Sequence, residues 1–439
     1  MDELPKWRRG GNLSPLAISD IPAAFVSALL EADGSPERAV LILMNKYIFC
    51  LSSLHTYLED SLNVQINFSK LTAGDMGPYV DVMDVLPLQY LKPFQLHRAR
   101  LPTSVFKNTM TDIDLLMPQF VSFRGGHDYV EEMARCVAPI FNHVVAAFKP
   151  HITGTLASIM SPALRPGMVK DRDRLVSYFK AFGVIVLVII ETKRMCHYDD
   201  EYFNCIAQLV AECDACDFDN SGSNFEPSIP LHGIITDGHQ FTFYRYDSTP
   251  QPQPLLHQGT LFPVATHPRA DAGPLMTVLH LGPAAYMCSF RPICECVLYV
   301  FWMGLLEGMR FQLHLSLKGV TRAQAQRDQC GGDGDDGDGD GEMERRVGES
   351  EGWLEVDAVA RDALDLAVQA AQDAAAAGRD GVEDGYGPGN ANARFTAADD
   401  KARRAWDRIR ESVDAAPLHG REPPFSIISD WNEEQVERA

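Results

Sequence analysis

The sequence predicts an α/β protein in which a mixed β-sheet is flanked by helices, with a helical N-terminal part and a disordered acidic C-terminal tail. Three observations predict this class. The run Gly183–Ile190 is apolar and rich in β-branched residues, as is typical of a strand buried on both faces. Apolar residues at helical spacing precede and follow this run, and two short strand patterns come next. After Gln324 the sequence becomes rich in Gly and Asp, so it buries too little apolar surface to offset the entropy of ordering.

Residues 1–126 are predicted to form a mainly helical N-terminal region. Ile21–Ala32 has helical spacing and is closed by an Asp-Gly pair, and a second helix begins after Ser35 and its following proline. Residues 70–126 are rich in turn formers, and the sequence predicts only short helices and loops there.

Residues 127–325 are predicted to form an α/β core. His127–Phe148 has the pattern of an amphipathic helix, which Pro139 is expected to kink. A second helix, Asp199–Cys213, follows the buried strand, and the largely apolar helix Arg291–Leu313 closes the core.

Two short strands, Leu231–Ile235 and Gln240–Tyr246, are predicted to form a hairpin. The segment that joins them contains Asp237-Gly238, a pair that is typical of a type I′ turn. Because the turn itself needs an Asp-Gly pair, Asp237 is interpreted as a structural residue.

The acidic tail, residues 326–439, is predicted to be low in complexity and mostly disordered. Residues 330–439 hold 27 Asp and Glu against 12 Lys and Arg, a net charge of −15, whereas residues 1–329 carry −6. Two Ala-rich patches, 356–377 and 397–415, have charges at helical spacing and are candidates for marginal helices or for binding a protein partner. The tail would repel DNA, so any DNA contact is expected to come from the body.

The cysteine pattern predicts reduced thiols. Ten cysteines are scattered through the chain, which favours an intracellular protein of the cytoplasm or nucleus. The first residues lack the apolar run of a secretory signal, and the longest apolar runs are too short or too polar to span a bilayer, so no membrane segment is expected. Cys213-x-x-Cys216 and Cys294-x-Cys296 supply four thiols, but their helical context argues against a zinc site.

The buried strand ends in Glu191-Thr192-Lys193. Side chains two residues apart on a strand point to the same face, so this carboxylate and this ammonium are expected at one edge of the sheet. A metal-dependent phosphodiesterase needs this pair. The carboxylate helps to hold Mg²⁺, which polarises the phosphate, and the lysine positions the attacking water and stabilises the added charge. The alternative is an ordinary salt bridge at the end of a strand.

The order of the segments adds a family resemblance. An apolar strand leads into Glu-x-Lys, a helix carries Ala207-Gln208-Leu209, and Gly233-Ile-Ile-Thr-Asp-Gly238 precedes an aromatic-rich strand. This order, over about residues 127–247, resembles the PD-(D/E)xK or restriction-endonuclease-like superfamily, and in particular its uncharacterised fungal members. The resemblance implies a restriction-endonuclease-like core and a Mg²⁺-dependent nuclease that acts on DNA phosphodiester bonds. It implies catalytic roles for Glu191, Lys193 and Gln208.

The resemblance also implies further metal ligands. The preceding helix would supply an acidic residue, Glu131 or Glu132, and an aspartate after a proline would supply another. Gly167 stands at that position here and has no side chain with which to bind a metal. Asp171 or Asp173 could replace it, although a shift of four or six residues moves a carboxylate roughly 13–20 Å along an extended chain.

Three readings therefore stay open. The chain is an active nuclease, or a catalytically inactive copy of that fold that serves as an interaction module with a partner-binding tail, or a structural α/β protein whose Glu-x-Lys is accidental. The best candidates for phosphate contact are the basic residues around the motif. These are Arg165, Lys170, Arg172, Arg174, Lys180, Lys193 and Arg194.

Overall fold

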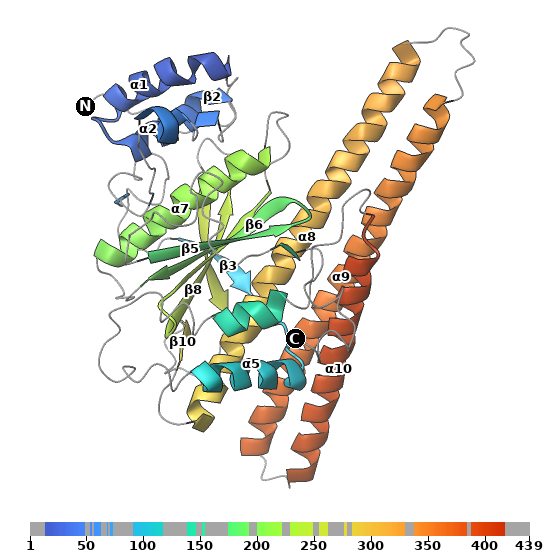
Figure 1. Ribbon diagram of the computed structural model, residues 1–439. Coiled ribbons are helices and arrows are strands. Elements are labelled where there is room, and N and C mark those ends of the chain that lie inside the picture. Colours follow the sequence, from blue (N-terminus) through green and yellow to red (C-terminus); the bar gives the residue numbers. More distant parts are fainter. Residues whose placement is uncertain are drawn as a thin grey trace, which may run out of the picture.

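The computed structural model shows a mixed sheet between two helical layers (Figure 1). It describes residues 14–48, 53–54, 57–62, 68, 71–72, 91–116, 138–145, 152–153, 174–192, 200–221, 229–248, 254–261, 276–278, 283–329, 338–383 and 388–417. The predicted class, an α/β protein with a helix-flanked mixed sheet, is confirmed over these residues.

The sheet has the strand order β3-β9-β8-β7-β6-β5-β4, and β10 pairs with β8 beside this path. Two pairs are parallel, β6 with β7 and β3 with β9, and the other pairs are antiparallel. The strands are β3 (Lys92–Leu96), β4 (Ile152–Thr153), β5 (Arg174–Ala181), β6 (Val184–Thr192), β7 (Leu231–Thr236), β8 (Gln240–Asp247), β9 (Leu255–Leu261) and β10 (Met276–Thr277).

Strand β6 lies near the middle of the sheet and confirms the strongest sequence signal. All residues from Val184 to Ile190 are buried. The strand is apolar on both faces because each face meets a helical layer. Strands β7 and β8 confirm the predicted hairpin strands.

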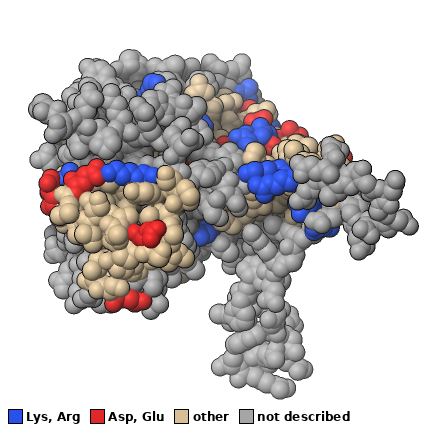
Figure 2. Space-filling model, turned by 90° about the horizontal axis from the view of Figure 1, so that it is seen from above, with Lys and Arg blue, Asp and Glu red and all other residues tan. Residues whose placement is uncertain are grey.

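Helix α7 (Asp200–Ser221) covers one face of the sheet, and α1 (Ile21–Glu31) and α2 (Pro36–Lys46) lie beyond it, with α2 against α7 (Figure 1). The Ser35 hydroxyl caps α2 by accepting the Arg38 N–H at 3.3 Å, and Pro36 occupies the first turn, where its missing N–H costs nothing. Short elements accompany these helices: β1 (Ser14–Pro15), η1 (Ile18–Asp20), β2 (Tyr47–Ile48) and η2 (Leu58–Leu62). From above, the largest coloured surface is mostly uncharged and carries acidic and basic side chains mainly at its rim (Figure 2).

The other layer contains α8 (Pro283–Gln329), with Pro292 inside it, and α5 (Thr103–Leu116). Residues 138–145 are also helical. Residues 1–126 were predicted to form a mainly helical region apart from the α/β core. Within this region, β3 instead forms the edge strand of the core sheet, beside β9.

The C-terminal tail differs from the mostly disordered segment expected of residues 326–439. Residues 338–383 form α9 (Asp338–Glu383) and residues 388–414 form α10 (Pro388–Asp414), a helical hairpin that packs along α8 (Figure 1). The Trp302 indole N–H of α8 donates to the Ala360 carbonyl at 3.1 Å. Alanines at helical spacing let the helices approach closely, so patches that looked marginal alone are stabilised by packing.

In the turn between β5 and β6, Phe182 is buried against α9, whereas Gly183 is exposed. Phe182 and Gly183 both have positive φ, +51° and +92°, as in a type I′ turn. A bulky residue seldom adopts this conformation. Phe182 is held there because its ring packs edge-to-face on Trp353 at 5.2 Å and its carbonyl accepts the Gln312 amide at 2.6 Å.

The turn between β7 and β8 differs from the predicted type I′. Only Gly238 has a positive φ there, at +79°. The Asp237 carboxylate accepts the backbone N–H groups of His239 and Gln240 at 3.0 and 2.7 Å. These bonds fix the turn and support the structural interpretation of Asp237.

Helix α8 crosses the sheet so closely that it needs glycine. A Cβ added at Gly308 would lie 2.9 Å from the Ala181 carbonyl oxygen, whereas one added at Gly348 on α9 would meet nothing within 4 Å. Gly308→Ala is expected to lower the free energy of unfolding by about 1–3 kcal/mol. Gly348→Ala should raise it by about 0.5–1 kcal/mol, because alanine favours a helix. Urea unfolding of both variants measures these two changes. Equal changes in the free energy of unfolding would contradict the close contact between Gly308 and the Ala181 carbonyl.

Helix α8 is also long and apolar enough to cross a membrane, over Ala285–Arg322, although 83% of its most apolar window is buried inside the protein. An apolar helix at the centre of a packed core has the same properties.

Candidate functional site

The candidate site lies at the edge of the sheet where β6 and β7 end. Glu191, next to the last residue of β6, pairs with Thr236 at the end of the parallel strand β7 and with Leu175 of the antiparallel β5. In open α/β sheets, ligands bind beyond the carboxyl ends of parallel strands. The backbone therefore brings Glu191 to the edge at which a substrate could reach it.

The structure describes few of the residues predicted from sequence to act here. Glu191 is placed by its backbone. The other predicted ligands and bases lie outside the described residues: Glu131, Glu132, Gly167, Asp171, Asp173 and Lys193.

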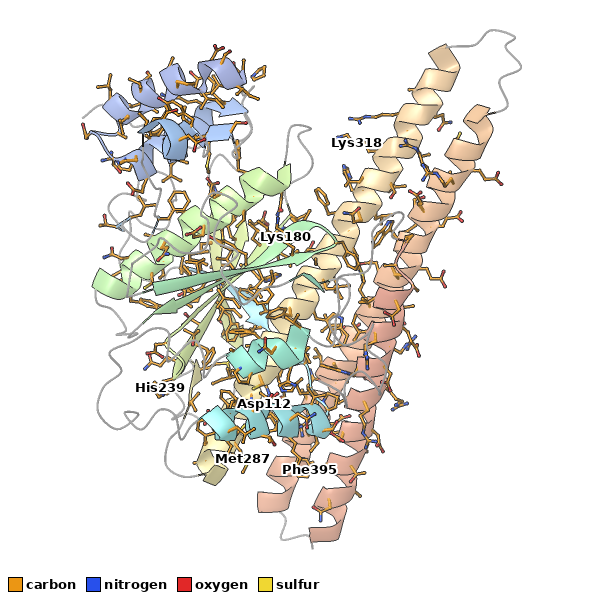
Figure 3. The ribbon with its side chains drawn as sticks, in the orientation of Figure 1. Asp112, Lys180, His239, Met287, Lys318 and Phe395 are labelled. Atoms are coloured by element: carbon orange, nitrogen blue, oxygen red, sulfur yellow. The ribbon has the colours of Figure 1, made fainter. Side chains whose placement is uncertain are left out.

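The predicted basic cluster is divided by the sheet. Arg174 begins β5 opposite Thr192, at the same edge as Glu191. Lys180 pairs with Ile185 at the other end of the strand, about 20 Å away at about 3.3 Å per residue. Figure 3 shows Lys180 well apart from His239, which marks the edge at which β7 ends. Lys180 is therefore excluded from a phosphate site at Glu191, and the prediction was wrong for this residue.

Gln208, the predicted catalytic amide, is buried between α7 and the sheet, with 1% exposure. It lies about 12 Å from the start of α7 at about 1.5 Å per residue, in the interior of the layer. Its side chain hydrogen-bonds Glu212, whose carboxylate accepts the Tyr178 hydroxyl at 2.5 Å. Gln208 is therefore part of a buried hydrogen-bond network with Glu212 and Tyr178.

This network gives Glu212 an unusual acidity. Burial raises the pKa of Glu212 from its ordinary value of 4.5 to about 7, against the opposing hydrogen bonds from Tyr178 and Gln208. Burial also raises the pKa values of Tyr178 and Cys213, which face the same carboxylate. A carboxyl group with this pKa exchanges a proton near neutrality, but its full burial keeps it from a substrate.

The raised pKa predicts a pH-dependent stability. Between pH 4.5 and about 7, the folded state holds a proton on Glu212 that the unfolded state has lost. The free energy of unfolding is therefore highest below pH 4.5 and falls as the pH rises to about 7. The loss is about 3 kcal/mol at about 1.4 kcal/mol per pH unit. Glu212→Gln should remove this slope between pH 5 and pH 8 in urea unfolding, whereas Glu411→Gln at an exposed position of α10 should keep it. An unchanged slope in Glu212→Gln would contradict the assignment.

Sequence reasoning missed two further buried acids on α7. The Asp214 carboxylate accepts the Tyr246 hydroxyl at 3.0 Å, and the Asp217 carboxylate accepts the Ser248 hydroxyl at 2.6 Å. The available signal was the run of acids at Glu212, Asp214 and Asp217 within an apolar helix. These bonds fasten α7 to β8 and so fix the layer behind the candidate site.

The described residues contain no group of three or more His, Cys, Asp or Glu side chains that could hold a metal ion. Cys213 and Cys216 lie in the core between the sheet and α7, whereas Cys294 and Cys296 lie in the core on the other face. The two pairs therefore cannot share a zinc ion.

The chain matches no known family model, no curated protein and no solved structure.

Proposed function

We propose that the chain is a metal-dependent nuclease-like protein that acts on DNA phosphodiester bonds, with its reaction centre at the carboxyl end of β6. The observation that carries this proposal is the position of Glu191, beside Thr236 at the edge where two parallel strands end. A carboxylate at such an edge can hold a divalent ion in contact with a substrate.

The topology supports the same proposal. Strand β6 pairs with antiparallel β5 on one side and, through the crossover helix α7, with parallel β7 on the other. Helices cover both faces. A mixed sheet flanked by helices, with Glu-x-Lys at the end of its buried strand, is what the resemblance to PD-(D/E)xK nucleases implies.

The residues have distinct proposed roles. Glu191 would be one ligand of Mg²⁺, with Asp171 or Asp173 as a second and Glu132 as a further one. When bound, the ion would polarise the phosphate. Lys193 would orient the attacking water and stabilise the charge that develops on the phosphate. Gln208 takes no part in this scheme, because its side chain is committed to Glu212.

A second candidate is an inactive copy of the same fold that serves as an interaction module. The buried position of Gln208 and the glycine at position 167 favour it. Its proposed partner-binding segment needs revision, because α9 packs against α8 and α10 packs against α9, so these residues are not a free acidic tail.

The test is cleavage of plasmid and single-stranded DNA by the full chain in Mg²⁺ or Mn²⁺. Glu191→Gln and Lys193→Met should each lower the rate at least about 100-fold, the scale of removing one group that stabilises the transition state. Glu355→Gln, at an exposed position of α9, is the matched control and should keep the wild-type rate.

The outcomes separate the two candidates. Cleavage that disappears in both variants and in chelator supports the nuclease. A wild-type chain that unfolds cooperatively but cleaves neither DNA with either ion supports the inactive module. If both variants cleave DNA at the wild-type rate, the reaction centre does not lie at the end of β6.

A further inference from the structure

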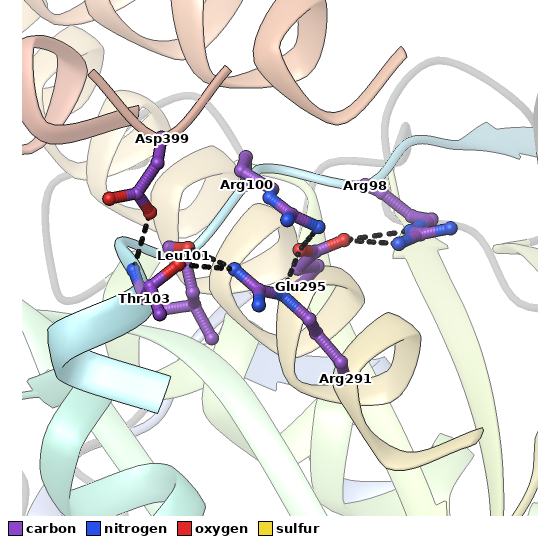
Figure 4. Close-up of polar contacts among 7 residues, drawn as sticks. All are labelled: Arg98, Arg100, Leu101, Thr103, Arg291, Glu295 and Asp399. Atoms are coloured by element: carbon purple, nitrogen blue, oxygen red, sulfur yellow. Dashed lines mark hydrogen bonds and ion pairs between the residues drawn. The ribbon is translucent and has the colours of Figure 1, made fainter. Parts of the chain in front are cut away.

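Three arginines converge on one glutamate where β3 leads toward α5 (Figure 4). Arg98 donates its Nε and Nη2 hydrogens to Oε2 of Glu295 at 2.8 and 2.6 Å. Arg100 donates from Nη1 to Oε1 at 3.0 Å, and Arg291 donates from Nε to the same oxygen at 3.2 Å. Glu295 belongs to α8, so the cluster joins this helix to the edge of the sheet.

The cluster carries two positive charges in excess of its single carboxylate. The side chains of Arg98, Arg100 and Arg291 are 25%, 9% and 18% exposed, and that of Glu295 is fully buried. Water therefore screens this excess poorly.

Other contacts leave the excess charge in place. Arg291 also donates to two neutral acceptors, the Leu101 carbonyl at 3.0 Å and the Thr103 hydroxyl at 3.4 Å. Within the described part of the chain, Glu295 is the one carboxylate that these arginines contact.

The surroundings of Arg100 are unfavourable for its charge. Its Nε lies buried without a hydrogen-bond partner among the described residues. Burial lowers the pKa of Arg100, Glu295 opposes this shift, and the charges of Arg291 and Arg98 add to it. A buried N–H that finds no acceptor costs free energy, and an anionic oxygen beside Arg100 would reduce the cost of its charge.

The neighbouring acid from the helical hairpin is already engaged. Asp399 of α10 accepts the Thr103 backbone N–H at 2.7 Å and the Arg403 Nε–H at 3.2 Å (Figure 4). Asp399 therefore caps the first turn of α5 and pairs with Arg403, and it does not neutralise the charge of the arginine cluster.

We propose that Arg98 and Arg100 bind the phosphate group of a small molecule, either inorganic phosphate or a phosphomonoester. A phosphate carries about −1.5 to −2 charges at pH 7, which matches the excess of two. Guanidinium groups match phosphate oxygens in shape and donate to two of them at once. Arg98 is the most exposed of the three, so a ligand from solvent would contact it first.

The depth of the cluster favours a small ligand over a nucleic acid. A duplex backbone would meet Arg98 at the surface, whereas the side chain of Arg100 is only 9% exposed, which leaves room for contact with a compact group only. Arg98 and Arg100 follow β3, four strands away from β6, so this site is separate from the proposed reaction centre.

The test measures the unfolding temperature of the full chain in inorganic phosphate, glycerol phosphate and chloride at one ionic strength, with calorimetric titration of the same ligands. A ligand that binds only the folded state raises the unfolding temperature in a saturable way. Arg98→Gln leaves Glu295 paired with two arginines and should bind phosphate at least tenfold more weakly. Arg98→Lys keeps the positive charge but not the planar guanidinium that donates to two oxygens at once. It should lose phosphate affinity to an intermediate extent. Arg404→Gln, an exposed arginine of α10, is the matched control and should bind as wild type.

The outcomes decide the source of the phosphate. A saturable response to inorganic phosphate alone, or to the ester alone, identifies which ligand is bound, provided that Arg98→Gln weakens it. Equal binding by wild type and Arg98→Gln, or no response to either ligand, would overturn the proposal. Stabilisation by duplex DNA alone, lost in Arg98→Gln, would also overturn it and would assign the cluster to nucleic acid.

Discussion

A chain that ends at Gln329 is expected to lose cooperative folding. The helical hairpin α9–α10 supplies large apolar residues to the core beside α8, among them Trp353, Val356 and Leu364. At about 1.5–3 kcal/mol for each buried side chain, these three alone correspond to about 5–9 kcal/mol. A whole domain is stable by only about 5–15 kcal/mol, so the remaining body would be near or below its folding threshold.

Specific bonds would be lost together with this apolar surface. Without Trp353, the strained turn at Phe182 loses the ring that holds it. The Trp302 indole and the Arg100 backbone N–H lose their acceptors, the carbonyls of Ala360 and Ala367, at 3.1 and 2.9 Å. Buried donors without acceptors add to the cost.

Circular dichroism and urea unfolding check this expectation. The control is a chain that ends at Pro417, which keeps both helices of the hairpin and should unfold at the wild-type urea concentration. If the chain that ends at Gln329 unfolds cooperatively at that same concentration, the hairpin is not part of the core.

Removal of the Glu295 carboxylate is expected to have the second largest effect. Glu295→Gln leaves three arginines, at most 25% exposed, without a negative partner. Removing one partner from a buried ionic cluster costs about 3–5 kcal/mol, because the charges that remain are desolvated and repel one another. Phosphate should restore part of this loss if the proposed anion site exists.

Urea unfolding in chloride measures the effect, and Asp362→Asn is the matched control. Asp362 pairs with Arg408 at 3.7 Å on the surface, where it is 67% exposed. A surface pair contributes about 0–1 kcal/mol, so this variant should stay close to wild type. Similar losses in the two variants would show that burial does not set the energy of the Glu295 cluster.

The sequence predicted the elements whose patterns are local. Strand β6 is apolar from Val184 to Ile190 because both of its faces are covered there, and no loop or surface helix has that pattern. The tail was misjudged because its helices depend on a partner. Alanines such as Ala360 and Ala367 give little apolar surface to an isolated helix, but against α8 they are fully buried.

The candidate site was predictable only in part, for a related reason. The spacing of Glu191 and Lys193 fixes which edge of the sheet the motif reaches, and the register with Thr236 agrees. Long-range packing decides the rest. Gln208 looked like a catalytic amide from its place in the chain, but Glu212 one turn later engages it. The arginine cluster joins residues almost 200 positions apart, which no local pattern reveals.

Titration of Mn²⁺ into the full chain, followed by the resonance of the free ion, tests the proposed reaction centre most directly. The account predicts that wild type removes free Mn²⁺ from solution and that Glu355→Gln matches wild type. Glu191→Gln should bind Mn²⁺ with an affinity at least about tenfold lower, which corresponds to about 1.4 kcal/mol of binding free energy. Equal uptake by wild type and Glu191→Gln, or no uptake by wild type, would contradict a metal-dependent centre at the end of β6.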